Sequence, residues 1–448
     1  MPNSSVTVRR FDGVQARVGP EPPNSQSYDL AILRFDDTGA LVDPQELNAV
    51  QECIASARAN PNGAVVLLFL HGWHHNAEWN HADETGDEHF RAFRKILSAL
   101  MLREAERYFG GPHGGGRRVV GIYLGWNGDP AMRWLARAPY LTHASFWNRY
   151  RVARRIGAGG ALRDALRLVV TATKGPLSPG SGAASVNLPE SPLVLIGHSM
   201  GALMLESAFL TLLKAPDRPL VHKAPVQESV VEVRRDGVRV SFPDVVIALN
   251  SAADSSIMHE IRKELAAQRL VKTVQAAGIN YSPPLLISAT SEADRDTRTV
   301  WRLANLPWLG RRTDGHDRTL FTHALTLQQA ASRCTARGPI DFNQAWHCVR
   351  APVPERAPNP SIAIDLPLRD RRADELDLPF ARYCLSPIGN PQRSEPAWVF
   401  QLPKALVANH NDIFNAKARE LVLGLIQISG AVMSLAEDWQ NTFEPETV

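Results

Sequence analysis

Residues Ser191–Phe209 read Ser-Pro-Leu-Val-Leu-Ile-Gly-His-Ser-Met-Gly-Ala-Leu-Met-Leu-Glu-Ser-Ala-Phe, and this stretch decides the fold. Its apolar run, Leu193 to Ile196, predicts a short strand buried on both faces, as in a parallel sheet. Residues Ala202 to Leu213 predict a helix with an apolar face. The Gly-x-Ser-x-Gly sequence at 197–201 lies between the two and therefore predicts a sharp strand-to-helix turn.

This turn makes particular demands on Ser199 and on the glycines around it. We expect Ser199 to adopt a strained backbone conformation that directs its hydroxyl above the sheet edge. Gly197 and Gly201 are needed because a Cβ at either position would collide with the neighbouring strand or helix. The helix N-terminus stabilises a developing negative charge. The stretch, with His198 inside the turn, thus predicts a nucleophile elbow; the alternative is a structural turn that carries a serine.

The bulk composition is that of an ordinary soluble globular protein. The chain has 448 residues, 44% hydrophobic and 21% charged, with a net charge of +3. The mild charge gives no reason to expect a nucleic-acid partner, and no stretch approaches the roughly 18 consecutive apolar residues of a membrane helix. The polar N-terminus lacks the apolar core of a secretory signal. We expect a cytoplasmic protein without a transmembrane segment; export without a cleavable signal is also compatible with this composition.

The cysteines do not predict a metal site, and no motif predicts a cofactor. Cys53, Cys334, Cys348 and Cys384 have no Cys-x-x-Cys spacing. We expect reduced thiols, as in a cytoplasmic protein. The alternative is a disulfide among the last three, which all lie in one region.

Buried strands alternate with helices along most of the chain, which is the pattern of an α/β fold. Asp236-Gly237 predicts a type I′ turn in a β-hairpin over 229–242, a decoration of the parallel core. The predicted strands are residues 28–35, 64–70, 118–124, 193–196, 244–249, 284–289 and 397–401, and the predicted helices are residues 43–58, 87–108, 131–174, 202–213, 255–270 and 415–435.

The predicted fold class is α/β, with a mostly parallel, doubly wound sheet, the hairpin decoration and a long insertion. Residues 1–27 are expected to be a flexible N-terminal segment. Residues 28–296 and 396–448 form the predicted core. Residues 297–395 have weak periodicity and many Pro, Arg and Asp residues, and they are predicted to be an insertion and a candidate lid or cap.

A histidine-rich loop follows the predicted strand at 64–70. It reads His-Gly-Trp-His-His-Asn over residues 71–76. Gly72 would let the backbone approach a reacting carbonyl in the substrate pocket, and the N–H of Trp73 or of Gly72 would point at the oxyanion. The N–H of Met200 would be the second donor. Each donor of this kind stabilises a tetrahedral intermediate by about 3 kcal/mol.

The same loop also suggests zinc, because His-x-x-His-His carries metal-ligating side chains. No second cluster completes a site. We therefore favour a hydrogen-bonded loop that shapes the pocket, and we predict no metal. The candidate ligands would be His71, His74, His75, His81, Asp83 and Asp87.

A nucleophilic serine needs a base, and the base needs an orienting carboxylate. After an elbow of this kind the expected chain order is Ser, acid, His. Asp294 is the fifth residue after the predicted strand that ends at Ala289, and it is the favoured acid. Asp296 and Asp254 are the alternatives.

His410 is the favoured base, because it lies between the last predicted strand and the last predicted helix. His323 is its main rival and falls in the insertion over 297–395, together with His316 and His347. A lone loop histidine is usually structural, so this assignment depends on the place of His410 in the whole pattern.

Aromatic and basic residues offer candidates for substrate recognition. Trp126 follows the strand 118–124 at the carboxyl edge of the sheet, where ligands bind, and is assigned to the substrate pocket. The aromatic residues of the segment 131–174 line an acyl pocket or pack the helix on the sheet, and packing is favoured. Its arginines form a solvated face or bind an anionic lipid head group. These residues are Trp134, Tyr140, Phe146, Trp147, Tyr150, Arg149, Arg151, Arg154 and Arg155.

Four segments together resemble the α/β-hydrolase superfamily, and bacterial esterase- or lipase-like members in particular. They read Gly-His-Ser-Met-Gly at 197–201, His-Gly-Trp at 71–73, Thr-Ser-Glu-Ala-Asp at 290–294 and His-Asn-Asp-Ile-Phe at 410–414. The resemblance spans about residues 28–435. It implies an α/β-hydrolase fold, a triad of Ser199, Asp294 and His410, and an oxyanion hole made by the Trp73 and Met200 amides. The chain departs from the family pattern in its long acid-to-histidine separation and in the hairpin.

The resemblance implies a serine hydrolase that cleaves carboxylic esters, lipid or other, through an acyl-enzyme. Phospholipase, thioesterase or amidase activity is the nearest competitor, because the same triad serves all acyl transfers. A non-catalytic binding or scaffold protein on the same fold is the alternative from another class. The expected partner is a small-molecule or lipid ester, and peripheral membrane contact is compatible with it. The sequence carries no signal for an oligomeric state.

Overall fold

The computed structural model has an α/β fold with a mostly parallel sheet. The chain divides into two compact units. The first consists of Met1–Gln227 and Val240–Val246, and the second consists of Glu228–Arg239 and Ile247–Val448. Among the described residues no helix is long and apolar enough to cross a membrane. The structure describes residues 9–12, 27–77, 79–80, 85–107, 116–128, 139–175, 191–215, 231–235, 238–239, 242–253, 255–276, 279–281, 284–294, 325–329, 362–365, 382–387, 396–402 and 404–428.

The first unit contains the strands on which the predicted elbow is built. β2, β6, β3 and β7 pair in parallel, whereas β1 is antiparallel to β2. β1 falls within the segment 1–27 that was predicted to be flexible. Every residue of β3 and β7 is buried, which explains their continuous apolar sequences. In order across the sheet the strands are β1 (Arg9–Asp12), β2 (Ser27–Phe35), β6 (Arg118–Trp126), β3 (Ala64–Leu70) and β7 (Leu193–His198).

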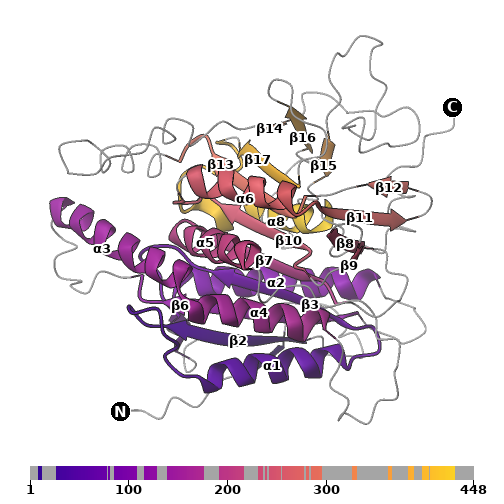
Figure 1. Ribbon diagram of the computed structural model, residues 1–448, viewed down its shortest axis with the longest axis horizontal. Helices are drawn as coiled ribbons and strands as arrows, with labels where there is room; N and C mark the ends of the chain where they lie inside the picture. Colours follow the sequence, from indigo (N-terminus) through magenta and orange to yellow (C-terminus); the bar gives the residue numbers. More distant parts are fainter. Residues whose placement is uncertain are drawn as a thin grey trace, which may run out of the picture. The chain divides into compact units, whose positions relative to one another are not determined.

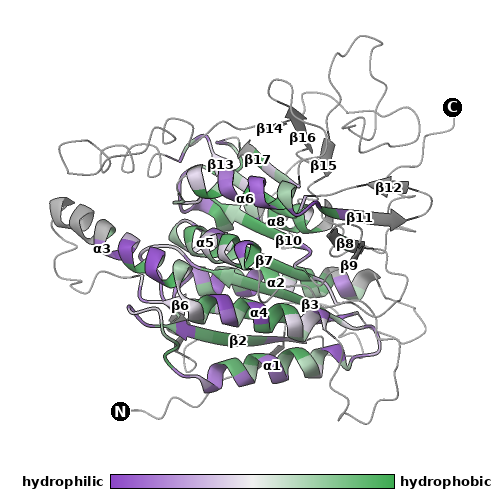
Figure 2. Ribbon diagram, viewed as in Figure 1, coloured by the Kyte–Doolittle hydropathy of each residue, from purple (hydrophilic) through white to green (hydrophobic). Residues whose placement is uncertain are grey.

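Two helices of the first unit, α1 (Gln45–Arg58) and α4 (Gly160–Lys174), are amphipathic. α4 buries Leu162, Leu166 and Val169, which lie on one face because they are three or four positions apart. In Figure 2 the ribbons of α1 and α4 alternate between purple and green, while β3 and β7 are mostly green. Figure 1 labels the other helices of this unit, which are α2 (Glu88–Arg107), α3 (Pro139–Ala158) and α5 (Met200–Lys214). Two short strands, β4 (Trp79–Asn80) and β5 (Thr85–Gly86), form an antiparallel pair.

The single helix predicted over 131–174 is instead two helices, and residues 131–138 lie outside the described part of the chain. α3 ends at Ala158 and α4 begins at Gly160. Gly159 between them has an extended conformation, with φ −73° and ψ 154°. Glycine favours such a break because it has a low helix propensity.

Arg149 of α3 is buried, which corrects the prediction of a solvated face at this position. It is 3% exposed. Its guanidinium donates to both carboxylate oxygens of Asp37 (2.9 and 2.8 Å) and to the carbonyl of Asn127 (2.8 Å). Arginine suits this position because its planar fork binds a carboxylate through two bonds. The side chain ties α3 to the turn after β2 and to the loop after β6.

The second unit carries the strands that precede the predicted acid and base. β13, β17 and β14 pair in parallel, and β14, β16 and β15 pair antiparallel. The last three strands belong to the insertion over 297–395, so part of it extends the sheet beside β17; its role as a lid or cap stays a prediction. The order is β10 (Val245–Leu249), β13 (Leu286–Ser291), β17 (Ala397–Leu402), β14 (Leu325–Gln329), β16 (Arg382–Pro387) and β15 (Ile362–Asp365), and β10 is divided between the units.

A small separate sheet contains the predicted hairpin over 229–242. β8 (Val231–Arg235) and β9 (Val238–Arg239) pair antiparallel. β8 also pairs with β11 (Leu270–Ala276), and β11 pairs with β12 (Ile279–Tyr281). The sequence did not predict β11, because the preceding helix was extended to residue 270. The remaining elements of this unit are α6 (Ser255–Ala267), the short 3-10 helix η5 (Asp412–Phe414) and α8 (Ala416–Ile428).

Candidate active site

The backbone of Ser199 has the strained conformation that the sequence predicted. Its φ is +55° and its ψ is −122°, a combination that residues other than glycine rarely adopt. Ser199 lies between the end of β7 and the first residue of α5, and its side chain makes no capping bond to α5. The residue is 5% exposed. Backbone strain of this kind costs about 1–3 kcal/mol and clusters at functional sites.

Two glycines make the turn sterically feasible. A Cβ on Gly197 would lie 2.7 Å from Cα of Ala202. A Cβ on Gly201 would lie 2.3 Å from the carbonyl oxygen of Leu70. Backbone atoms do not tolerate such approaches, so neither position accepts another residue unless the chain moves. The collisions predicted for both glycines are therefore present, and α5 starts directly against the end of β3.

The loop after β3 lies against the elbow at Gly72. A Cβ on Gly72 would lie 2.8 Å from Cβ of Ser199 and 3.1 Å from Nδ1 of His198. Met200 is the first residue of α5, where an N–H has no carbonyl acceptor within its own helix. The two predicted oxyanion donors, the amides of Met200 and Trp73, thus belong to backbone segments that adjoin each other.

His71 holds this loop at the end of β6 through hydrogen bonds. Its ring hydrogen-bonds the Gly72 carbonyl through Nδ1 (2.9 Å) and accepts the backbone N–H of Trp126 at Nε2 (3.0 Å). A carbonyl only accepts and a backbone N–H only donates, so His71 is neutral with its proton on Nδ1. The Trp126 indole donates to the His71 carbonyl (3.0 Å) and stacks on its ring. Trp126 is 4% exposed and braces the loop; its role in a pocket stays a prediction.

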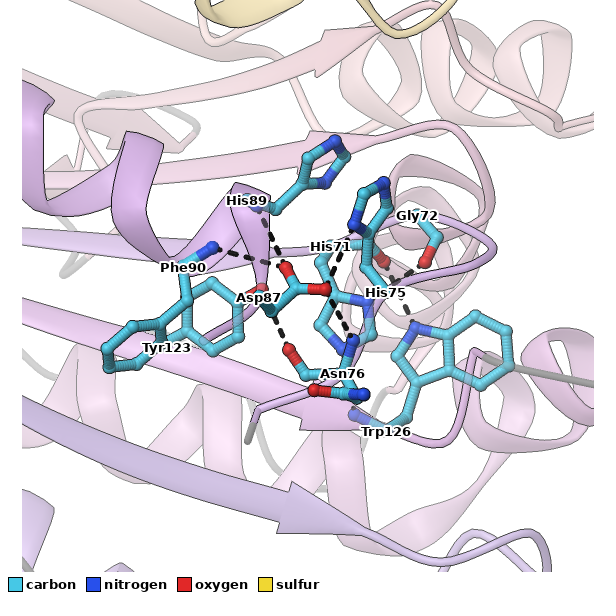
Figure 3. Close-up of polar contacts among 9 residues, drawn as sticks. All are labelled: His71, Gly72, His75, Asn76, Asp87, His89, Phe90, Tyr123 and Trp126. Carbon is cyan, nitrogen blue, oxygen red and sulfur yellow. Dashed lines mark hydrogen bonds and ion pairs between the residues drawn. The ribbon is translucent and has the colours of Figure 1, made fainter. Parts of the chain in front are cut away.

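His75, in the same loop, pairs with a carboxylate (Figure 3). Its Nδ1 lies 3.1 Å from Oδ2 of Asp87. The carboxylate also accepts three backbone N–H groups, those of Asn76 (3.2 Å), His89 (2.8 Å) and Phe90 (3.3 Å), and so caps α2. Burial raises the pKa of Asp87, but the hydrogen bonds from His75 and the Asn76 N–H, together with the electrostatic effect of the neighbouring histidines, outweigh it, and the pKa lies below its ordinary value. Asp87 is therefore an ionised anchor of the loop.

Sequence reasoning missed Tyr123 and His89 in this cluster. The Tyr123 hydroxyl donates to the Asn76 carbonyl (3.2 Å), and burial raises the pKa of Tyr123 well above its ordinary value, so the hydroxyl keeps its proton. His89 stacks on His75 with ring centroids 3.3 Å apart, and it lies edge-on to His198 at 5.0 Å. The signal in the sequence was a histidine, His89, near the start of the amphipathic helix α2 and a tyrosine, Tyr123, within the apolar strand β6.

The loop histidines take part in hydrogen bonds and ring contacts. His74 has a φ of +67° and stacks on Trp73, with ring centroids 3.9 Å apart. Within the ranges that the structure describes, no group of three or more His, Cys, Asp or Glu side chains is placed to hold a metal ion. The other candidate ligands, His81 and Asp83, lie outside those ranges.

The predicted acid and base lie side by side in the second unit. Asp294 follows β13 and is fully buried, and His410 lies between β17 and η5. Nδ1 of His410 is 2.9 Å from Oδ2 of Asp294, although the residues are 116 positions apart. A carboxylate that accepts from Nδ1–H orients the ring and leaves Nε2 as the basic nitrogen. Ser199 belongs to the first unit and this pair to the second.

Several predicted alternatives lie outside the described residues, so the structure does not compare them with Asp294 and His410. They are Asp254, Asp296, His316, His323 and His347.

Cys53 is buried and free. Burial raises its pKa to about 12, so it remains a thiol at neutral pH and is a poor nucleophile. The predicted alternative of a disulfide among Cys334, Cys348 and Cys384 lies outside the described side chains.

Comparisons of the chain with protein-family models, with curated proteins and with solved structures find no match. The functional assignment therefore depends on the local geometry of these residues and on the order of the segments that carry them.

Proposed function

We propose that the protein is a serine hydrolase that cleaves carboxylic esters through an acyl-enzyme intermediate. The observation that carries this proposal is the backbone of Ser199, held at φ +55° between a buried strand and a helix N-terminus. This conformation is typical of a nucleophile on an α/β-hydrolase elbow. The pair of His410 and Asp294 supports the proposal, because it has the composition and hydrogen bond of a general base with its orienting acid.

In the proposed acylation, the Ser199 hydroxyl attacks the acyl carbonyl carbon and transfers its proton to Nε2 of His410. The carbonyl oxygen becomes an oxyanion that accepts hydrogen bonds from the Met200 and Trp73 amides. The C–O bond to the alcohol then breaks, and the leaving alcohol takes the proton from His410. Asp294 accepts the Nδ1 hydrogen bond throughout and stabilises the imidazolium.

Deacylation repeats these steps with water. His410 removes a proton from a water molecule as its oxygen adds to the acyl carbon. The tetrahedral intermediate then releases Ser199, which regains a proton from His410, and the product is a carboxylic acid. Both half-reactions use only these side chains, backbone amides and water, so the proposal needs no cofactor.

The proposed substrates are lipid or other acyl esters. Trp73 and Phe146 meet edge to face, with ring centroids 5.3 Å apart, and Trp73 directly follows the glycine that adjoins Ser199. Apolar aromatic surface beside a nucleophile suits an apolar acyl chain. Phospholipids, thioesters and amides are the competing substrate classes, and a panel of these substrates would rank them.

Replacement of Ser199 by alanine tests the proposal. Ser199→Ala is expected to lower kcat for short p-nitrophenyl esters by about 10³-fold or more, because covalent catalysis is lost. Ser207→Ala, two turns further along α5, is the matched control and is expected to keep wild-type turnover. Thermal unfolding should confirm that both variants fold. Wild-type turnover by Ser199→Ala, or no turnover of any ester by the wild type, as a scaffold protein predicts, would overturn the proposal.

A further inference from the structure

Asn250 is a buried polar residue that sequence reasoning did not select. It directly follows β10, is fully buried and has a φ of +43°. Asparagine tolerates this left-handed region better than most residues other than glycine. Its backbone N–H donates to the carbonyl of Ala289 (2.9 Å) in β13. The residue is thus fixed beside the strand that leads to Asp294.

The Asn250 side chain links the loop of the proposed acid to the loop of the proposed base. Its Oδ1 accepts the backbone N–H of Ser291 (2.8 Å), and its Nδ2 donates to the backbone carbonyl of His410 (2.8 Å). The orientation of the amide is fixed, because one partner only donates and the other only accepts. One side chain therefore spans two segments that are far apart in the sequence.

Ser291 makes a second link between the same loops. Its hydroxyl donates to the carbonyl of Val407 (2.6 Å) and accepts the N–H of Ala293 (3.0 Å). Ser291 is fully buried and lies three residues before Asp294, whose N–H in turn donates to the Ser291 carbonyl (3.1 Å). The loop that carries the proposed base is therefore held by hydrogen bonds at two of its backbone carbonyls, those of Val407 and His410.

We propose that Asn250, together with Ser291, is a positioning residue that sets the distance and orientation of the His410 ring against Asp294. This inference rests on the proposed function, in which that pair serves Ser199. A hydrogen bond of 2.9 Å between side chains on two different loops requires both backbones to be held in place, and a misplacement of 1 Å at such a site lowers rates by about 10²-fold. Neither residue touches the substrate in this account.

Alanine substitution in a double-mutant cycle tests the inference. Asn250→Ala is expected to lower kcat for ester hydrolysis by about 10²-fold with little change in KM. In an Asp294→Ala background the same change is expected to lower kcat less than about twofold, because the pair that it positions is already lost. Ser291→Ala removes the second link and provides an independent variant, expected to lower kcat by about tenfold. Asn60→Ala, in a partly exposed turn of the other unit where the amide accepts the Asn62 N–H (2.9 Å), is the matched control and should leave kcat unchanged.

The outcomes separate the two proposals. Wild-type protein that hydrolyses esters through Ser199, with Asn250→Ala and Ser291→Ala equally active, would overturn the positioning role and leave the proposed function intact. Equal losses from Asn250→Ala in the wild-type and Asp294→Ala backgrounds would also overturn it, since a merely structural role is independent of the pair. Wild-type protein without Ser199-dependent turnover would overturn the proposed function, and the positioning role with it.

Discussion

Among the residues that the structure describes are two largely buried His–Asp pairs with similar nitrogen–oxygen distances, one in each unit. Nδ1 lies 3.1 Å from the carboxylate oxygen in the His75–Asp87 pair and 2.9 Å in the His410–Asp294 pair. The two histidine side chains are also almost equally exposed, at 12% and 11%. Distance and burial therefore do not separate a structural pair from a proposed catalytic one.

The surroundings of the two pairs differ. Asp87 caps α2 through the backbone N–H groups of His89 and Phe90 and also accepts the N–H of Asn76. His75 is covered by the stacked ring of His89.

The second pair is held between loops that follow β13 and β17, with Asn250 linking them. His75 also follows a parallel strand, β3, but Asp87 lies at the start of α2. Both members of the second pair follow parallel strands, at the edge of the sheet where ligands bind in α/β folds. The comparison teaches that the elements holding a pair, rather than the pair itself, indicate its role.

Removal of each histidine is expected to give the largest difference between the two pairs. His410→Ala is expected to lower kcat for ester hydrolysis by about 10⁵-fold or more, because no base then accepts the proton of Ser199. His75→Ala is expected to lower kcat less than about tenfold, since it loosens only the loop. Ester turnover by the folded variants measures both effects. A large loss in His75→Ala with a small loss in His410→Ala would exchange the two roles.

Neutralisation of each carboxylate is expected to give the next largest effect. Asp294→Asn should lower kcat by about 10⁴-fold, because an amide favours the wrong tautomer of the His410 ring. Asp87→Asn should keep kcat per folded molecule within about tenfold of the wild type. Single-turnover kinetics on both variants check this difference. Equal losses of kcat would show that the pairs do not differ as described.

The stability effect of Asp87→Asn is expected to be moderate and to depend on pH. Asparagine can still cap α2 through its Oδ1, so at the cap the variant loses only the negative charge at the helix N-terminus, which lowers the free energy of unfolding by about 0.5–1 kcal/mol. Because the folded pKa of Asp87 lies below its ordinary value of 3.8, the ionised side chain stabilises the fold above that value, and the contribution is lost as the pH falls through the folded pKa. Thermal unfolding from pH 3 to pH 8 should therefore show a difference from the wild type that shrinks below about pH 4. A difference that is constant with pH would contradict this.

Replacement of His89 by phenylalanine is expected to have the smallest effect, and it tests whether the histidines around Asp87 are only structural. A phenyl ring keeps the stacking on His75, a contact worth about 0.5–1.5 kcal/mol. His89→Phe should therefore change the free energy of unfolding by less than about 1 kcal/mol and leave kcat unchanged. Chemical denaturation and ester turnover measure the two quantities. A large loss of kcat would mean that the histidine cluster takes part in the reaction.

The local elements around the elbow were predictable from the sequence, because short-range physics determines them. β3 occupies the predicted residues 64–70, since a continuous apolar run bounded by turns has few alternatives. The strain at Ser199 followed from the Gly-x-Ser-x-Gly turn, which permits few backbone paths. The proximity of Asp294 to His410 followed from chain order alone.

Long-range partners outside the expected Ser–acid–His order could not be predicted, because the sequence does not encode them as a local pattern. Arg149 was assigned to a solvated face, but its side chain is buried, and its ion pair with Asp37 joins positions 112 residues apart. Asn250 looked like an ordinary polar residue after a strand. The two hydrogen bonds of its side-chain amide join it to residues 41 and 160 positions away. The break at Gly159 was missed for another reason, because the local signal, a glycine of low helix propensity, was outweighed by the helical pattern on both sides of it.

The most direct measurement of the central claim is the mass of the protein after reaction with a fluorophosphonate, with the modified peptide identified by tandem mass spectrometry. An activated serine hydroxyl displaces fluoride from this reagent and retains the phosphonyl group. We predict one adduct, on Ser199, in the wild type and in His75→Ala, and no adduct in Ser199→Ala. His410→Ala should react more slowly than the wild type by a factor of about 10³ or more. A wild type that stays unmodified, or a His410→Ala variant that reacts at Ser199 as fast as the wild type, would contradict the account.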